Sequence, residues 1–257
     1  MHESQLLARI AARSAGLVAG PGWDVLVGPG DDCAVLRSDK GGLLLLTVDQ
    51  LVEGRHFEPG TPTDLIARKA VARSVSDVAA MGGSPSWALA TGLLPKGMAG
   101  ADDLFDAMAR WASHWRCPLV GGDLASHADA SQPLTLTVTL GAAVPPDHAP
   151  VLRSGARPGD LVWLTGPIGG SFASGRHLTF EPRLEAGLAA SRRNSGVTAM
   201  IDLSDGLGRD ADRVARASGV RIEIVAHALP LHPDAGDWRR AAAEGEDHEL
   251  LITAPAR

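Results

Sequence analysis

Lysine, cysteine and long apolar runs are scarce in this chain of 257 residues. Cys33 and Cys117 are the only thiols, too few for a disulfide framework and without a metal-ligand spacing, which favours a reducing, cytoplasmic setting. No stretch approaches the roughly 18 consecutive apolar residues of a membrane span. Residues 1–20 carry an acidic residue and arginines in an amphipathic helical pattern, unlike the apolar core of a signal peptide. We therefore expect a soluble protein with no membrane partner.

The charge balance narrows the class of partner. A formal net charge of −6 argues against nucleic-acid binding by the bare protein. Lys40, Lys69 and Lys96 are the only lysines, and no G-x-x-x-x-G-K-[ST] phosphate loop occurs. An acidic protein of this kind can hold a polyanion only through cations. A hydrophobic content of 45% permits one large core or two modest ones.

Aspartates recur at or near the ends of apolar runs, beside glycine or small residues. They are Asp31, Asp32, Asp49, Asp77, Asp123, Asp202 and Asp205. In α/β folds such positions present metal and phosphate ligands, and Mg²⁺ prefers carboxylate oxygen and bridges it to phosphate. The pattern predicts magnesium-nucleotide chemistry. Taken singly, Asp32, Asp160 and Asp210 are more typical of turn formers or helix N-caps.

Helical and strand patterns alternate along the chain, which predicts an α+β (mixed α/β) fold. Strands are expected over 43–48, 87–94, 118–120, 134–144, 161–165 and 220–225, and helices over 4–17, 63–82, 101–115 and 206–219. The 118–120 strand would end at Gly121-Gly122-Asp123. Pro145-Pro146 indicates a boundary between domains 1–145 and 146–257. The loop Gly166–Gly170 fits a phosphate cradle and a plain strand-to-helix turn equally well.

Seven motifs follow one another along nearly the whole chain. They are GPGDDCAVL (28–36), TVDQLVEGRHF (47–57), SDVAAMG (76–82), GGD (121–123), RSGARPGD (153–160), IDLSDGL (201–207) and GEDHELL (245–251). In this order they resemble the motifs of the thiamine-monophosphate kinase family, within the aminoimidazole ribonucleotide synthetase superfamily. Seven ordered motifs are far more specific than a single glycine loop.

The resemblance implies a two-domain fold. Its N-terminal domain, 1–145, would be β-rich, bind ATP and metal, and pair two subunits into a homodimer; its C-terminal α/β domain, 146–257, would be shorter than in the family. The implied reaction transfers the γ-phosphoryl group of ATP, the co-substrate, to thiamine monophosphate, giving thiamine diphosphate and ADP, with several Mg²⁺ ions. Phosphoryl transfer depends mostly on positioning and charge neutralisation, so aspartate-bound Mg²⁺ can substitute for a phosphate-loop lysine.

The resemblance also assigns residues. The metal ligands would be Asp31, Thr47, Asp49, Asp77, Asp123, Asp202 and Asp205. Asp49 and Asp123 would be catalytic; Gly122, Asp123, Arg153 and Ser204 would contact ATP; His56 and Glu246 would face the thiamine phosphate. An arginine suits a phosphate oxygen, and a carboxylate suits a cationic thiazolium ring. The other histidines, His177 and His248 among them, show no ligand spacing and are interpreted as surface residues.

Two departures from the family pattern keep other classes open. Val48 stands where the family generally has a hydroxyl residue, and the chain reaches Arg257 soon after GEDHELL, without the aromatic residue that covers the thiamine ring. One alternative is a nucleotide-binding relative with impaired transfer. The other is a superfamily ATP-dependent enzyme that acts on a different substrate.

Overall fold

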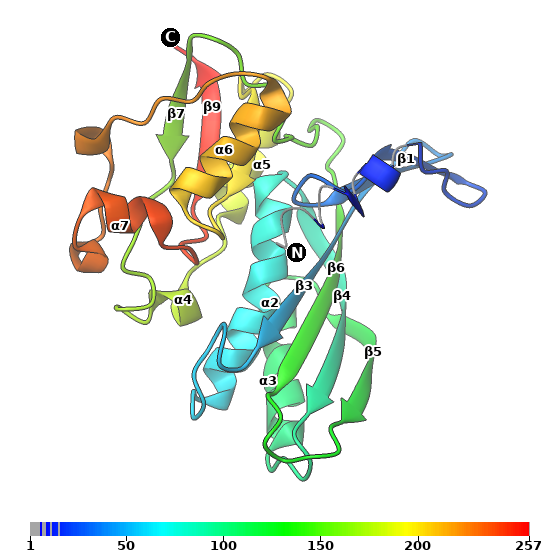
Figure 1. Ribbon diagram of the computed structural model, residues 1–257. Helices are drawn as coiled ribbons and strands as arrows, with labels where there is room; N and C mark the ends of the chain where they lie inside the picture. The colour runs from blue at the N-terminus through cyan, green and yellow to red at the C-terminus, as the bar shows by residue number, and fades with distance from the viewer. Residues whose placement is uncertain (1–5, 7–8, 11, 15, 257) are drawn as a thin grey trace.

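Two β-sheets, with helices between and around them, make up the computed structural model, which describes residues 6, 9–10, 12–14 and 16–256 (Figure 1). The helix expected over 4–17 lies partly outside the described residues; residues 6, 9–10 and 12–13 are helical. Both sheets combine with helices as the mixed α/β prediction requires, and that prediction is confirmed. No helix among the described residues is long and apolar enough to cross a bilayer.

The larger sheet belongs to the N-terminal half. Its strands are β1 (Trp23–Val27), β2 (Ala34–Ser38), β3 (Leu43–Val52), β4 (Ser84–Leu94), β5 (Leu119–Ser126) and β6 (Thr135–Ala143). They lie in the order β1-β2-β3-β6-β4-β5. Neighbours are antiparallel except β4 and β5, which are parallel and are connected through α3 (Ala101–His114), as a parallel pair requires a crossover.

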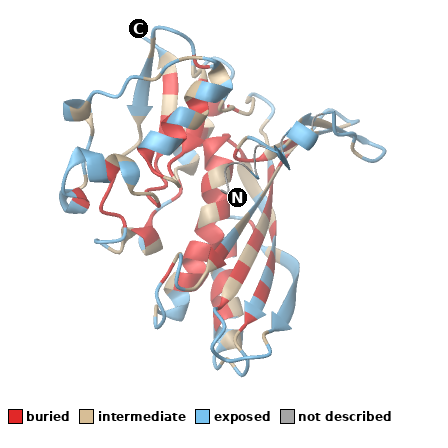
Figure 2. Ribbon diagram, viewed as in Figure 1, coloured by how far each residue is buried: buried red, intermediate tan, exposed pale blue. Residues whose placement is uncertain are grey.

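The two faces of this sheet differ. Alternate β3 side chains, such as Leu45 and Leu51, are buried beneath α2 (Thr63–Ala80), which packs on β3 and β6 while α3 covers β4 and β5. The side chains that alternate with these point to the other face, away from the helices. On that face Val48 of β3 is 61% exposed and Leu89 of β4 is 37% exposed. Figure 2 shows the burial concentrated along α2 and the strands behind it. One sheet face is therefore left open and partly apolar.

The smaller sheet belongs to the C-terminal half and has the order β7-β9-β8, all antiparallel. Its strands are β7 (Asp160–Leu164), β8 (Ala199–Asp202) and β9 (Leu250–Pro255). The helices there are α4 (Arg176–Thr179), α5 (Leu184–Ser191), α6 (Leu207–Ser218) and α7 (Trp238–Ala243), with short 3₁₀ turns at Ala226–Ala228 and Pro233–Ala235. On the side away from the large sheet, α2 contacts α4, α5 and β8 (Figure 1). Residues of the two halves thus meet along α2.

Three local predictions are wrong in detail. The segment 220–225 has no strand pairing: a cavity of about 660 Å³ lies between it and β7, whereas paired strands must approach to about 4.8 Å. Strand β3 continues to Val52, so Asp49 lies within it rather than after it. Strand β5 runs through Gly121-Gly122-Asp123 instead of ending there, because pairing with β4 continues to Ser126.

Candidate active site

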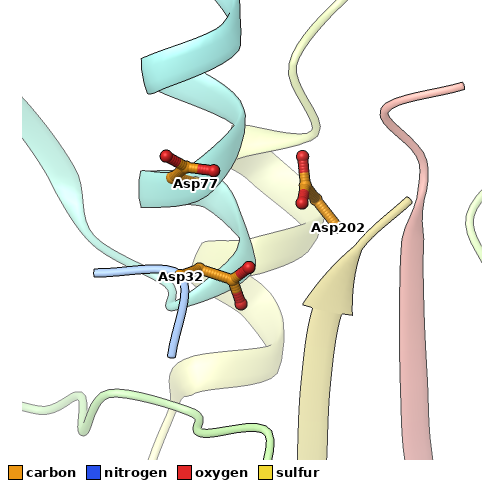
Figure 3. Close-up of side chains that lie close together, drawn as sticks. All are labelled: Asp32, Asp77 and Asp202. Carbon is orange, nitrogen blue, oxygen red and sulfur yellow. The ribbon is translucent and has the colours of Figure 1, made fainter. Parts of the chain in front are cut away.

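Three aspartates from separate parts of the chain converge at one end of α2. Asp32, Asp77 and Asp202 each offer a carboxylate oxygen, and these oxygens lie within 4.8 Å of one another (Figure 3). Asp32 lies in the turn after Gly30, whose φ of 132° is a conformation that glycine permits; Asp77 is on α2; Asp202 ends β8. We call these three residues the carboxylate cluster. Its members come from both halves of the chain.

Asp32 lies in a turn, as predicted, but its side chain does not act as that of a turn former. Its side chain is only 1% exposed, and Arg153 Nη2 lies 2.6 Å from its Oδ1, across 121 residues of sequence. A turn former would instead bond to its own neighbouring backbone. Asp160 does so, because it accepts from the backbone N–H of Arg157. Asp210 likewise acts locally, accepting from the N–H of Asp205 at the start of α6.

The electrostatics of the carboxylate cluster fit a cation. Burial, followed by Asp49, Asp202 and Asp32, raises the pKa of Asp77 well above its ordinary value. Burial also raises the pKa of Asp32 to about 7, although Arg153 opposes the change. Burial alone would raise the pKa of Asp202 too, but bonds from His248 and Ser76 hold it below its usual value. Buried carboxylates without enough positive charge are the donor set that Mg²⁺ prefers.

Several predicted metal ligands lie around this cluster. The Thr47 hydroxyl, on β3, donates to Oδ2 of Asp77. Asp49, two residues farther along β3 and on the same face, contacts Arg73 at 3.4 Å. Asp31 accepts from the backbone N–H of Arg153 at 3.1 Å. These three residues therefore border the carboxylate cluster from the β3 side and from the Arg153 side.

Arg153 and the turn after β8 form the second border. Besides its ion pair with Asp32, Arg153 has Nε 3.9 Å from Asp31, and burial is outweighed by these carboxylates, so its pKa stays above the usual value. Ser204 lies two residues after Asp202, and its carbonyl accepts from the N–H of Glu246. Asp205 does not join the cluster, because its carboxylate pairs with Arg213 on α6.

Gly122 and Asp123 lie apart from the other predicted site residues. Strand β5 is three strands from β3 in the sheet order. The register pairs Asp123 with Thr91, Thr91 with Thr137 and Thr137 with Gln50, so Asp123 shares the open face. Asp49 and Asp77 lie on the helix-covered side. Within one chain, the structure does not bring Asp123 to the carboxylate cluster.

His56 and Glu246 meet across the two halves of the chain. Glu246 lies 2.7 Å from Lys69 Nζ and 2.6 Å from Arg73 Nη1, both on α2, and Lys69 Nζ also donates to the His56 carbonyl at 2.6 Å. Burial, then Arg73, lowers the pKa of His56 to about 4, so this imidazole is neutral at pH 7. Burial opposes ionisation of Glu246, but His248, Arg73 and Lys69 hold its pKa far below the ordinary value.

His248 and His177 are buried, so their interpretation as surface residues is wrong. His248 Nδ1 lies 3.2 Å from Asp202, its Nε2 lies 3.6 Å from Glu246, and its ring stacks on Phe180. His177 Nδ1 lies 2.8 Å from Lys69 Nζ. Backbone bonds from Glu246 N to Ser204 O and from His248 N to Leu203 O fix this segment beside β8. His248 therefore connects the carboxylate cluster with Glu246.

Sequence reasoning missed Arg73, Lys69, His248 and the role of Asp32. A usable signal existed for two of them: Lys69, Arg73 and Asp77 are spaced by four residues on one predicted helix and so share a face. Asp32 lies among the recurring aspartates and His248 lies in the GEDHELL motif, but their buried contacts could not be predicted, because their partners are distant in the sequence.

Several known proteins resemble this chain in sequence and in fold. Residues 30–144 match the family described as AIR synthase related protein, N-terminal domain. The chain is 34% identical to the thiamine-monophosphate kinase of Salmonella typhimurium, covering 96% of this chain and 82% of that protein. It is 35% identical to the thiamine-monophosphate kinase of Bacillus subtilis, over 88% of this chain and 77% of that protein. The solved structure of AaThiL complexed with AMPPCP and TMP superposes with a TM-score of 0.78 at 30% identity, covering 98% of this chain and 85% of that one.

Proposed function

The chain belongs to the thiamine-monophosphate kinase family, and on that premise we propose that it transfers the γ-phosphoryl group of ATP to thiamine monophosphate with the help of Mg²⁺. The observation that carries the proposal is the carboxylate cluster lying between two different sets of residues. Arg153 borders it on one side. Arg73, Glu246 and His56 border it on the other. Such a site can hold two phosphate-bearing substrates on opposite sides of shared metal ions.

Magnesium would be held by Asp32, Asp77 and Asp202, with Thr47, Asp49 and Asp31 close by. Bound there, it would neutralise phosphate charge and orient the transferring group. Asp32 adds to the ligand set taken from the family pattern. The assignments of Asp123 and Asp205 to metal stay predictions, as do those of Gly122 and Ser204 to ATP.

The nucleotide side would be served by Arg153. A guanidinium binds phosphate oxygens with two parallel donors, and Arg153 is held in place by its contact with Asp32. Its backbone N–H is already fixed on Asp31. A phosphate bound by Arg153 would therefore lie next to the carboxylates that hold the metal.

The acceptor side would be served by His56 and Glu246. His56 accepts from the N–H of Val52 through Nδ1, which leaves Nε2 as a neutral hydrogen-bond donor for the substrate. Glu246 is an ionised carboxylate at this site and suits the cationic thiazolium ring of thiamine. His56 would thus donate a hydrogen bond to thiamine monophosphate, and Glu246 would contact its thiazolium ring.

We also propose a homodimer formed through the open face of the large sheet, in the cytoplasm. Val48, Leu89 and Leu93 are 61%, 37% and 36% exposed on that face, and a second copy would cover them. Asp123 lies on the same face, so dimer formation would place it at or near the subunit interface. This offers a way for Asp123 to act although it is remote from the cluster within one chain.

The deciding experiment incubates purified protein with Mg²⁺, ATP and thiamine monophosphate and measures ADP and thiamine diphosphate by chromatography. We expect equal amounts of the two products and none in EDTA. Nucleotide binding without product would favour the impaired relative. ADP release that depends on a different acceptor would favour the third class, an enzyme acting on another substrate.

A further inference from the structure

Arg73 lies between a candidate catalytic carboxylate and a candidate substrate residue. Its Nη1 is 2.6 Å from Oε1 of Glu246, while its Nη2 and Nε are each 3.4 Å from oxygens of Asp49. Its side chain is 12% exposed, and those of Asp49 and Glu246 are 25% and 10% exposed. The guanidinium therefore sits where the β3 carboxylate meets the proposed acceptor side.

The donors of Arg73 are incompletely used. An ordinary N–H···O hydrogen bond spans about 2.7 to 3.2 Å, so only the contact with Glu246 is of full strength. Arg73 Nε is buried and has no hydrogen-bond partner among the residues that the structure describes. A cation bound to Asp49 would weaken the long Asp49–Arg73 attraction further. Two neighbouring donors, Nε and Nη2, then remain for an incoming ligand with paired oxygens.

Lys69, His56 and Arg153 are each less suited to this role than Arg73. The Lys69 side chain is fully buried, and its Nζ is already engaged by Glu246, the His56 carbonyl and His177. His56 is neutral at pH 7 and supplies no positive charge. Arg153 contacts Asp32 and is already assigned to the phosphates of the nucleotide.

From this geometry we infer that Arg73 is the residue that binds the phosphate of the acceptor, through Nε and Nη2, while Nη1 stays on Glu246. The inference rests on the proposed function and names the group that recognises its acceptor. The two neighbouring donors of a guanidinium match two oxygens of one phosphate. Glu246 binds Arg73 and is also the residue proposed to face the thiazolium ring. The contact between Arg73 and Glu246 would therefore fix the position of the phosphate relative to that of the ring.

The test compares Arg73→Met, which removes the charge but keeps most of the length, with Arg73→Lys, which keeps the charge but not the fork. Arg68→Met is the matched control: Arg68 lies on the same helix with a side chain 8% exposed, but it pairs with Glu181 and packs over Trp111, away from the site. Each protein is assayed for KM of thiamine monophosphate and of ATP, for binding of thiamine monophosphate by calorimetry with a non-hydrolysable ATP analogue, and for Tm.

We expect Arg73→Met to raise KM and Kd for thiamine monophosphate by at least about tenfold while the KM for ATP changes less than about twofold. The KM and Kd of Arg73→Lys for thiamine monophosphate should lie between those of the wild type and those of Arg73→Met. Arg68→Met should lower Tm without changing the KM of either substrate. A lower Tm with unchanged KM and Kd in Arg73→Met would show a merely structural counter-ion and overturn the inference. If the wild type binds thiamine monophosphate but forms no diphosphate, the proposed function fails, and the calorimetric comparison still decides the role of Arg73. Absence of binding by the wild type would overturn both.

Discussion

Asp77→Asn should make the metal-free protein more stable at pH 8, because the carboxylate cluster holds buried like charges. Asp77 accepts from Thr47, has no ion-pair partner among the described residues, and has a pKa well above its ordinary value through burial and then Asp49. An acid whose pKa is raised by folding destabilises the folded protein once the pH exceeds the unfolded value. The cost grows until the folded pKa is passed.

The neighbouring Asp32 gives the scale of this effect. A carboxyl pKa raised from 3.8 to about 7 corresponds to roughly 4 kcal/mol at full ionisation. Asparagine keeps the shape and removes one charge, so we expect a gain on the order of 1 to 3 kcal/mol at pH 8 in EDTA. This corresponds to roughly 3 to 10 °C in Tm. At lower pH the two proteins should differ less, since the raised pKa keeps more of the Asp77 carboxyl protonated there.

The assay is a pair of thermal melts at pH 5 and pH 8, each with EDTA and with Mg²⁺ plus ATP. His56 and His177, whose pKa values burial lowers to about 4, destabilise both proteins equally at low pH and cancel in the difference. With Mg²⁺ and ATP the wild type should gain more than the variant, because bound cations relieve the repulsion. A variant less stable than the wild type at pH 8 in EDTA, or a gap independent of pH, would refute the reasoning.

Other expectations concern catalysis and assembly. Asp49→Asn should lower kcat about a hundredfold or more with little change in thiamine-monophosphate binding, since neutralising phosphoryl charge is a transition-state effect; unchanged steady-state turnover would contradict this. His56→Ala should act mainly on the KM for thiamine monophosphate, because its imidazole is neutral and its Nδ1 accepts from the N–H of Val52; a fall in kcat with an unchanged KM would contradict this role in substrate binding. Sedimentation should show a dimer at micromolar concentration, and Val48→Asp, which puts a charge on the open face, should yield monomers. A monomeric wild type would contradict the proposed dimer interface.

The sequence allowed the secondary structure to be predicted wherever periodicity was strong. The run of four leucines before Thr47 predicted β3, and the helical spacing after Thr63 predicted α2 almost to its last residue. The strand over 220–225 was wrong because its apolar residues line a cavity beside β7 and have no partner strand. Apolar composition alone cannot distinguish these two environments.

The site could be predicted only as far as its residues lay in recognisable motifs. Asp77 and Asp202 were found in this way, but which aspartates meet depends on contacts across the chain. Its place near glycine predicts a turn-forming role for Asp32, and its partner Arg153, 121 residues away, cannot be inferred from that position. Asp123 was grouped with the others, yet the register of β5 places it on the open face. A period-two strand reverses the face with each residue, so a motif alone cannot tell on which side a ligand lies.

The backbone around the acceptor side bears on whether the protein is active or only binds nucleotide. Glu246 and His248 have φ values of 67° and 51°, a left-handed conformation that costs a non-glycine residue roughly 1 kcal/mol or more. That conformation brings one side chain to Arg73 and Lys69 and the other to Asp202. Nucleotide and metal binding alone need the carboxylates and Arg153, and neither requires Glu246 to be held beside α2. Phosphoryl transfer between two substrates explains why a strained segment connects the carboxylate cluster with the site of the acceptor. For transfer, the metal site and the acceptor site must stay at a fixed distance from each other.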